Sequence, residues 1–300
     1  MANQTHPDTT RLRKLLAEDP TLAAVRGAAG ELPVYLVGGA IRDALCDFPV
    51  DDIDLVVAGD PAPLVRALDP AATVHDRFGT AELVVGGRPG DVARARVERY
   101  ARPGALPDVA PGTIEDDLGR RDFTINAIAV PLNGPDAGAD GMLDPFEGMR
   151  DLRAGVLRAL HPRSFEDDPT RALRAARYAA RFDFDLSPDT ADLLPGVEFG
   201  RISNERFEAE LALIAREEHA LEALRLLDAW GLVPVDPERL ELARRALELA
   251  REPRWRDAAT REELILTACL GPIGPALEAL APEPSVPSEG VERAGRVRGP

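Results

Sequence analysis

Two aspartates separated by one residue give the first indication of chemistry in this sequence. Asp52 and Asp54 flank Ile53 at the start of a predicted strand, 53–57. Because alternate residues of a strand point to the same side, both carboxylates would project together while Ile53 enters the core. Mg²⁺ is usually held by one or two carboxylates together with substrate phosphates. The pair predicts a metal site with Asp52 and Asp54 as catalytic ligands, although such a short motif alone is also typical of solvated acids at a strand end.

A glycine pair lies upstream of these aspartates. Gly38 and Gly39 follow a predicted strand, 34–37, and precede a predicted helix, 40–46. Glycine lets the backbone approach a ligand closely, and the start of a helix offers unpaired N–H groups to a phosphate. Arg42 would add a positive charge there. An ordinary strand-to-helix turn is the alternative, but together with the aspartates the turn favours a site for a phosphorylated ligand.

A third acid is expected for transfer from a triphosphate, because one metal ion activates the attacking hydroxyl while another stabilises the leaving pyrophosphate. Asp91 is the candidate catalytic residue. It opens a predicted strand, 92–97, after a hairpin turn at 86–90 whose other strand, 82–85, is expected beside the Asp52 strand. An aspartate that caps the turn is the alternative.

The elements that position these residues change character along the chain. In the first 150 residues, helices are predicted at 11–28, 40–46 and 61–68, strands at 34–37, 53–57, 82–85 and 92–97, and a strand or other buried element at 124–130. Later, helices are predicted at 170–182, 203–216, 220–230, 237–250 and 261–270, with start signals at Pro169 and Ser203 and stop signals at Gly231 and Gly271. We therefore expect an α/β unit followed by an all-α C-terminal half, and a disordered tail at 283–300.

The composition is that of a folded chain with local positive charge. Hydrophobic residues make up 45% of the 300, and the net charge is −16, which argues against binding nucleic acid over the whole surface. Residues 150–181 nevertheless contain eight arginines and four acidic residues. No run suits a membrane span or a secretion signal, so a cytoplasmic location is expected. Cys46 and Cys269 lack metal-site spacing and are expected to be buried small residues.

Five motifs follow one another between residue 34 and about residue 211. They are Leu36-Val37-Gly38-Gly39-Ala40-Ile41-Arg42-Asp43 with Asp52-Ile53-Asp54; Arg120-Arg121-Asp122-Phe123-Thr124-Ile125-Asn126-Ala127; Asp144-Pro145-Phe146-Glu147-Gly148 with Asp151-Leu152; Asp167-Asp168-Pro169-Thr170-Arg171 with Arg174 and Arg177; and Ile202-Ser203-Asn204-Glu205-Arg206. In this order they resemble the motifs of class II tRNA nucleotidyltransferases and bacterial poly(A) polymerases. Asp167 stands where the fourth motif usually has Glu.

The resemblance implies a fold and a set of site residues. It implies a polymerase-β-like nucleotidyltransferase head at 1–155, a helical neck with base recognition at 156–217 and a reduced helical body at 218–282. Asp52 and Asp54 would hold two Mg²⁺ ions. The nucleotide-binding residues would be Gly38, Gly39, Arg42, Arg121, Asp122, Asn126, Asp168, Arg171, Arg174 and Arg177, with Gly39 and Arg42 at the triphosphate and Asp122 and Asn126 near the ribose.

Asp168 and Arg171 are the pair that the resemblance assigns to the choice of nucleotide. An aspartate accepts from the exocyclic amino group of cytosine or adenine, which uracil lacks, and an arginine donates to ring or carbonyl acceptors. The pair therefore explains selection of C and A without a nucleic-acid template. A helix cap at Asp168, and either a solvated face or a phosphate-binding stripe formed by Arg171, Arg174 and Arg177, are the alternatives.

The function implied is addition of C and/or A from CTP and ATP to the 3′ end of tRNA, with no membrane and no obligate protein partner. Poly(A) addition and partial addition of CC or A remain open. A non-catalytic RNA-binding relative is disfavoured by the aspartates, and a small-molecule nucleotidyltransferase by the arginine motifs.

Two further segments bear on this function. In the family, a flexible loop where residues 98–107 lie is associated with the switch from C to A addition. His75-Asp76 would suit a metal-dependent phosphohydrolase only with further histidines, which His6, His161 and His219 do not supply at suitable spacing.

Overall fold

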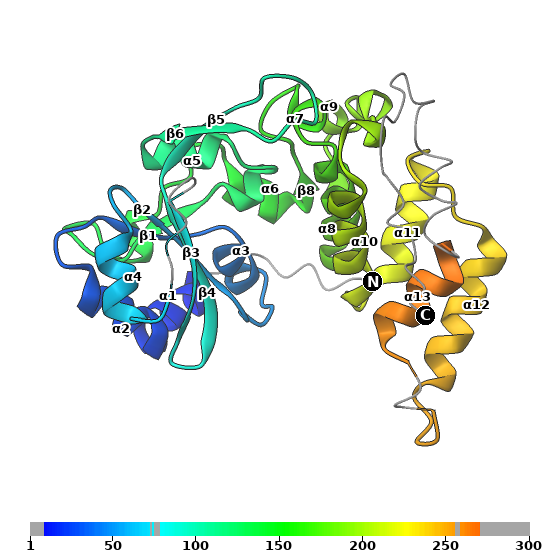
Figure 1. The fold of residues 1–300 in the computed structure, drawn as a ribbon, viewed down its shortest axis with the longest axis horizontal. Helices are drawn as coiled ribbons and strands as arrows, with labels where there is room; N and C mark the ends of the chain where they lie inside the picture. Colours follow the sequence, from blue (N-terminus) through cyan, green and yellow to red (C-terminus); the bar gives the residue numbers. More distant parts are fainter. Residues whose placement is uncertain (1–8, 73, 75–78, 256–258, 271–300) are drawn as a thin grey trace, which may run out of the picture.

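The structure is a computed structural model that describes residues 9–72, 74, 79–255 and 259–270. The His75-Asp76 pair, the helix stop at Gly271 and the tail at 283–300 lie outside these residues. Figure 1 shows the mixed α/β part on the left and a group of helices on the right, so the expected fold class is confirmed. None of the helices in the described ranges is long and apolar enough to cross a bilayer.

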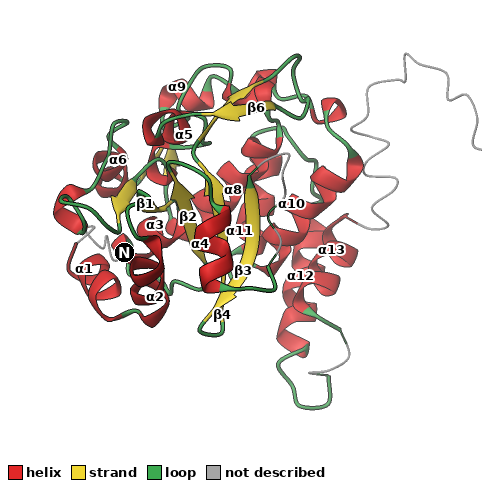
Figure 2. Ribbon diagram, turned by 60° about the vertical axis from the view of Figure 1, so that its left-hand side comes forward, coloured by secondary structure: helices red, strands yellow, loops and turns green. Residues whose placement is uncertain are grey.

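A five-stranded mixed sheet lies at the centre of the α/β part (Figure 2). Its strands are β1 (Val34–Val37), β2 (Ile53–Val57), β3 (Thr80–Val85), β4 (Arg88–Arg94) and β7 (Ala129–Pro131). Their order is β3-β4-β2-β1-β7, in which β2 and β4 are parallel and the other neighbours antiparallel. The carboxylate strand β2 is therefore central, and the sheet holds it rigidly from both sides.

Four helices pack around this sheet. They are α1 (Thr9–Glu18), α2 (Pro20–Ala29), α3 (Gly39–Leu45) and α4 (Ala62–Leu68). The prediction of one helix over 11–28 was wrong. The Asp19 side chain accepts from the backbone N–H groups of Thr21 and Leu22 and so caps a second helix, with Pro20 at its first position.

The β3–β4 hairpin differs from the prediction in a way that changes the place of Asp91. Gly86 and Gly87, with φ of 62° and 87°, form a two-residue turn, and β4 begins directly after them. The prediction that Asp91 opens the strand was therefore wrong, since it lies inside β4. It was also wrong that the other hairpin strand lies beside β2: β4 itself pairs with β2, and Asp91 stands opposite Asp54.

A connecting region of short elements joins the two halves. Its elements are β5 (Arg96–Arg99), β6 (Asp108–Pro111), α5 (Ile114–Gly119), η1 (Thr124–Asn126), η2 (Ala139–Gly141), α6 (Gly148–Ala154), β8 (Val156–Leu157), α7 (Ser164–Asp167), α8 (Thr170–Phe182), β9 (Asp185–Leu186), α9 (Pro188–Ala191), η3 (Leu194–Gly196) and η4 (Phe199–Arg201). The predicted strand 92–97 is divided between β4 and β5, which pairs with β6. The parallel pair β8–β9 is a small exception to the all-α expectation after residue 155.

The remaining helices lie where the periodicity of apolar residues predicts them. They are α10 (Asn204–Arg216), α11 (Ala220–Ala229), α12 (Pro237–Leu249) and α13 (Arg261–Leu270). Ser203 accepts from the backbone N–H of Arg206 as the predicted cap of α10. Gly231 follows α11 with a φ of 70°, as expected for a helix stop.

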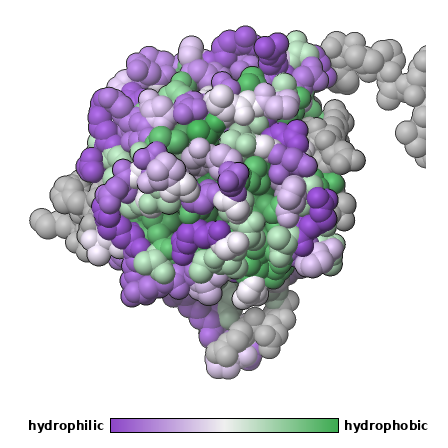
Figure 3. Space-filling view, turned by 90° about the vertical axis from the view of Figure 1, so that its left-hand side faces the viewer, coloured by the Kyte–Doolittle hydropathy of each residue, from purple (hydrophilic) through white to green (hydrophobic). Residues whose placement is uncertain are grey.

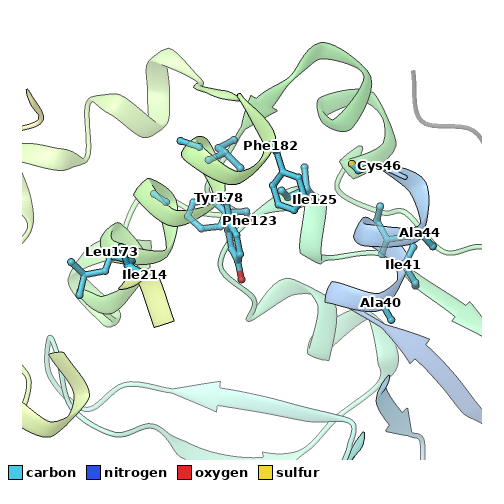
Figure 4. Close-up of a cluster of buried hydrophobic side chains, with 14 of the residues drawn as sticks. Ala40, Ile41, Ala44, Cys46, Phe123, Ile125, Leu173, Tyr178, Phe182 and Ile214 are labelled. Carbon is cyan, nitrogen blue, oxygen red and sulfur yellow. The ribbon is translucent and has the colours of Figure 1, made fainter. Parts of the chain in front are cut away.

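One large hydrophobic core extends from the α/β part into the helices. Figure 4 shows its centre, where Ile41 of α3, Phe123, and Tyr178 and Phe182 of α8 lie in one cluster. Both cysteines are free and buried, as predicted. Figure 3 shows polar side chains over much of one face of the molecule, with apolar patches between them. Both α3, which begins at Gly39, and α8, which carries the arginines, contribute side chains to this core.

Candidate active site

Two cavities meet at the predicted carboxylate pair. The first, here the arginine cavity, has a volume of about 600 Å³ and is lined by eight arginines and five acids. The second, here the acidic cavity, has a volume of about 570 Å³ and is lined by seven acids and three arginines. Both are lined by Gly39, Arg42, Asp52, Asp54, Arg177 and Tyr178. A group bound between the carboxylates would therefore be reached from two sides.

The structure brings Asp52 and Asp54 together as predicted. Ile53 is buried between them, at 1% exposure, while both carboxylates line both cavities. Burial raises the pKa of Asp54 above its ordinary value; Arg121 opposes this shift, and the charges of Asp91 and Asp52 add to it. A divalent cation would relieve this crowding of negative charge, so the donor set fits Mg²⁺.

Asp91 lines the acidic cavity only. Burial, and the negative charges of Glu82 and Asp52, raise its pKa. Within the described part of the chain, no group of three or more His, Cys, Asp or Glu side chains is arranged to hold a metal ion. The structure thus places Asp91 beside Asp54 in the sheet but leaves the catalytic role of this third acid a prediction.

Gly38 leaves room for two charged side chains. Its φ is 66°, and a Cβ there would lie 2.7 Å from Nη1 of Arg121 and 3.4 Å from Oδ2 of Asp54. The strand-to-helix turn therefore needs glycine both for its backbone conformation and for this close approach. The turn brings the Arg121 guanidinium, which also donates to Asp117 at 3.0 Å, to the edge of the carboxylate pair.

Arg42 is more buried than expected for a side chain that was predicted to contact a triphosphate. Its residue exposure is 5%, Nε donates to Asp43 at 2.8 Å, and Nη1 donates to the Asn126 side chain at 2.8 Å. The guanidinium also lies over the rings of Tyr178 and Phe182, at 4.7 and 4.9 Å. Arg42 thus connects α3 to α8, and its contact with phosphate remains a prediction.

A chain of hydrogen bonds continues from Arg42 to α10. Asn126 donates to Oδ1 of Asp122 at 2.9 Å, and Arg174 donates to Oδ2 of Asp122 at 3.0 Å and to Glu210 at 2.8 Å. Although burial acts to raise the pKa of Asp122, Arg174 and Asn126 hold it below the ordinary value. Asp122 and Asn126 both line the arginine cavity, and their place near the ribose stays a prediction. Arg174 is largely occupied by protein carboxylates.

Asp168 makes contacts at the start of α8, and its predicted role in base recognition stays a prediction. Its Oδ1 accepts from the backbone N–H and the hydroxyl of Thr170, the first residue of α8, at 3.0 and 2.6 Å. The same oxygen accepts from Arg206 at 2.9 Å, while Oδ2 has one ion-pair contact among the described residues, with Arg174 at 3.5 Å. Burial acts to raise the pKa of Asp168, but Arg174 and the Thr170 hydrogen bond hold it below the ordinary value. Oδ2 therefore remains an ionised acceptor at the cavity.

Unpartnered donors surround the arginine cavity. Among the described residues, the buried side-chain atoms without a hydrogen-bond partner are Nε of Arg121, Arg171 and Arg177, and Oε2 of Glu210. The three donors all belong to residues that line this cavity. An unsatisfied buried donor costs about 1–3 kcal/mol, and these three are grouped at the wall of one cavity. The alternative of a solvated arginine face on α8 does not hold, because Arg171 is buried and Arg174 and Arg177 are half-buried.

Hydrogen bonds hold the segment 98–107 against the rest of the connecting region. Gly104 donates to the carbonyl of Glu166 at 3.0 Å and accepts from Arg206 at 3.1 Å. Tyr100 donates to Glu98 at 3.0 Å, and burial together with that carboxylate raises the pKa of Tyr100 to about 12. Glu98, Tyr100 and Pro107 line the arginine cavity, so this segment forms one of its walls.

Gly104→Ala is expected to release this wall. The φ of Gly104 is 72°, and a Cβ would come within 2.5 Å of the carbonyl oxygen of Arg201. We expect a loss of about 1–3 kcal/mol in local stability, measured as faster tryptic cleavage at Arg102 and faster hydrogen exchange in 100–107. Gly134→Ala is the matched control, because Gly134 has a φ of 85° but open space around it. Equal effects of both variants would show that the packing at Gly104 is unimportant.

Several cavity residues were not assigned to the site from the sequence. They are Arg96, Glu98, Tyr100, Pro107, Arg120, Tyr178 and Arg206. Arg206 was recognisable, because it belongs to the fifth motif, but that motif carried no chemical role until the structure placed it against Asp168. Arg120 belongs to the second motif, and Glu98, Tyr100 and Pro107 to the segment 98–107, but none of them was assigned a role in the site from the sequence. Arg96 and Tyr178 carried no distinctive signal.

Comparisons with known proteins agree with this geometry. Residues 34–158 match the family described as the Poly A polymerase head domain. The chain is 41% identical over 211 residues to the CC-adding tRNA nucleotidyltransferase of Deinococcus radiodurans, which covers 69% of this chain and 56% of that protein. It is 44% identical over 203 residues to the A-adding tRNA nucleotidyltransferase of Aquifex aeolicus, covering 65% and 24%. The chain thus spans only part of these curated relatives.

Solved structures extend the likeness to most of the chain. A CCA-adding enzyme in its apo form II has a TM-score of 0.76 and 33% identity, covering 93% of this chain and 71% of that one. A tRNA nucleotidyltransferase complexed with a primer tRNA and an incoming ATP analog has a TM-score of 0.70 and 31% identity, covering 86% and 80%. These proteins differ in the nucleotides that their names say they add, so likeness alone does not choose among them.

Proposed function

Because this chain belongs to the family of class II tRNA nucleotidyltransferases and bacterial poly(A) polymerases, we propose that it is a template-independent RNA nucleotidyltransferase. It adds C and/or A from CTP and ATP to the 3′ end of tRNA and releases pyrophosphate. The observation that carries this proposal is the meeting of the two cavities at Asp52 and Asp54. One cavity is rich in arginine and suits a nucleoside triphosphate, and the other leaves the carboxylates open to a second reactant.

The proposed reaction is an in-line attack of the RNA 3′-hydroxyl on the α-phosphate. The bond from the 3′-oxygen to phosphorus forms, and the bond to the pyrophosphate oxygen breaks. Asp52 and Asp54 would hold two Mg²⁺ ions, which neutralise the charge that develops on the attacking and leaving oxygens. Gly38 and Gly39 let the triphosphate approach the backbone, and the Arg121 guanidinium beside Asp54 adds positive charge.

Nucleotide choice is proposed to use Asp168 and Arg171, which both line the arginine cavity. Among the described residues, Oδ2 of Asp168 has one ion-pair contact, with Arg174 at 3.5 Å, and Nε of Arg171 is buried without a hydrogen-bond partner. The aspartate oxygen accepts from the amino group of cytosine or adenine, and the arginine donates to a ring or carbonyl acceptor. Uracil lacks the amino donor, so this carboxylate would stay unpaired beside it.

Product analysis tests the proposal directly. tRNA transcripts that end before CCA, after C and after CC would each be incubated with Mg²⁺ and one labelled nucleotide, and the products sequenced. Addition of C, of A, or of both in order supports the proposal and identifies the form. Long ATP-only products on any RNA would indicate a poly(A) polymerase instead. Failure to transfer any nucleotide, by a chain that still binds tRNA, would indicate a non-catalytic RNA-binding relative.

Arg171→Ala is expected to reduce discrimination more than turnover. Loss of the buried guanidinium removes one member of the base-reading pair but leaves Asp52 and Asp54 in place. We expect the preference for CTP or ATP over UTP, measured as a ratio of kcat/KM, to fall at least about tenfold, on the scale of one charge-assisted hydrogen bond. Full retention of selectivity against UTP would contradict the protein-template interpretation.

A further inference from the structure

Three protein groups contact the guanidinium of Arg171, which lines the arginine cavity. Nη1 donates to the hydroxyl of Ser164 at 2.9 Å and lies 3.4 Å from Nε2 of His161. Nη2 donates to the carbonyl oxygen of Arg120 at 2.7 Å. Nε is buried and has no hydrogen-bond partner among the described residues. These contacts fix the rotation of the guanidinium at the cavity wall.

Ser164 contacts both members of the base-reading pair. Its hydroxyl accepts from Arg171, and its carbonyl oxygen accepts from the backbone N–H of Asp168 at 3.2 Å. The residue is completely buried, and its own N–H donates to the carbonyl of His161 at 3.1 Å. Ser164 is therefore fixed by the backbone on either side and does not itself line either cavity.

His161 can accept from Arg171 only while its ring is neutral. Burial and the positive charges of Arg171 and Arg163 lower the pKa of His161, while Asp167 acts in the opposite direction. At neutral pH the ring therefore carries one proton, and Nε2 is an acceptor when that proton is on Nδ1. Protonation would replace an acceptor with a positive charge beside the guanidinium.

We infer that Ser164 and His161 are positioning residues for nucleotide choice, because they set the rotation of the Arg171 guanidinium at the wall of the arginine cavity. The inference rests on the proposed role of Arg171 in reading the base. An arginine side chain has large rotamer freedom, and charge-assisted hydrogen bonds are directional enough to remove it. Without these acceptors the guanidinium would turn, and its N–H groups would donate equally well to the wrong base.

The test compares variants that remove an acceptor with variants that keep one. Ser164→Ala and His161→Leu remove an acceptor, whereas Ser164→Thr and His161→Gln retain it. Equilibrium binding of CTP, ATP and UTP would be measured alongside their incorporation into tRNA. We expect the preference over UTP to fall about tenfold in the first two variants and to stay near wild type in the second two. Ser187→Ala, which also removes a buried hydrogen-bonded hydroxyl, is the matched control and should leave the preference unchanged.

A pH profile separates positioning from a merely structural effect. The preference over UTP should decline in the wild type only as the pH falls below about 6.5, the ordinary pKa of histidine, because the pKa of His161 is lowered. His161→Gln should not show this decline. Unchanged preference in both Ser164→Ala and His161→Leu, or an equal fall in Ser187→Ala, would overturn the inference.

The two proposals can fail separately. If the wild type binds CTP or ATP in preference to UTP but transfers neither to RNA, the proposed function is wrong, and the binding preferences of the variants still decide the present inference. If the wild type binds all three triphosphates equally, the inference itself is overturned. If transfer is normal and the variants keep full selectivity, only the positioning role is lost.

Discussion

Asp54→Ala is expected to lower nucleotide transfer at least about a thousandfold while the chain stays folded. Asp54 is the half-buried member of the carboxylate pair, and its charge lies beside those of Asp52 and Asp91. Removal of its carboxylate would destroy the proposed metal site but also relieve like-charge crowding. We therefore expect the melting temperature without Mg²⁺ to be unchanged or higher, and single-turnover transfer of labelled nucleotide to be nearly absent.

Two comparisons make this prediction specific to the metal site. Asp60→Ala removes an exposed carboxylate outside both cavities and should leave transfer unchanged, while Asp91→Ala tests the third acid and should give an intermediate loss. Mg²⁺ should raise the melting temperature of the wild type but not of Asp54→Ala, and a chelator should abolish transfer until Mg²⁺ is restored. If Asp54→Ala kept more than about a tenth of the wild-type rate, the loss of rate would be much smaller than expected from removal of this carboxylate. That result would contradict the assignment of Asp54 to the metal site.

Elements with a local pattern could be predicted from the sequence. The strand 53–57 and the helix 170–182 were predicted with their observed ends. In the strand, alternation places Ile53 in the core and the two aspartates outside it, and this depends on neighbouring residues alone. In the helix, apolar residues recur at helical spacing up to Phe182. The placement of the carboxylate pair follows from the first pattern, and that of the α8 arginines at the cavity from the second.

The place of Asp91 could not be fixed in this way. The sequence offers three glycines and a proline between 86 and 90, and any of them could end a turn. The hairpin with β3 starts β4 at Arg88, opposite Val85, and pairing with β2 places Asp91 opposite Asp54. A register set by a partner strand far away in the chain leaves no local signal.

The hydrogen bonds and ion pairs of the arginines at the site could also not be predicted from the sequence. The motifs identified which arginines belong near the site but not which of them the protein itself occupies. Arg206 pairs with Asp168 across 38 positions, Arg174 with Asp122 across 52 and Arg42 with Asn126 across 84. The residues of these pairs come into contact only when α8 and α10 pack on the α/β part. Free donors such as Nε of Arg171 can be recognised only once the occupied ones are known.

Arg174→Met should be the most destabilising single change at the site. Arg174 contacts the carboxylates of Asp122, Asp168 and Glu210. Methionine keeps much of the side-chain volume but leaves three largely buried carboxylates without their shared cation. We expect the free energy of unfolding, measured by urea denaturation, to fall by about 3–5 kcal/mol. Arg225→Met is the control, because its ion pair with Glu222 is exposed and should change stability by less than about 1 kcal/mol.

The pH dependence of this loss of stability in Arg174→Met identifies its cause. Burial acts to raise the pKa values of Asp122 and Asp168, but the charge of Arg174 holds both below the ordinary value. A carboxylate with a lowered folded pKa stabilises the fold above its unfolded pKa, about 3.9 for aspartate, and this stabilisation is lost as the pH falls through the folded pKa. Without Arg174 the folded pKa values rise, so these groups protonate at a higher pH in the variant. The difference in the free energy of unfolding between the wild type and Arg174→Met should therefore shrink as the pH falls from about 7 to about 4. A difference that stays constant with pH would mean that lost packing, not uncompensated charge, destabilises the variant.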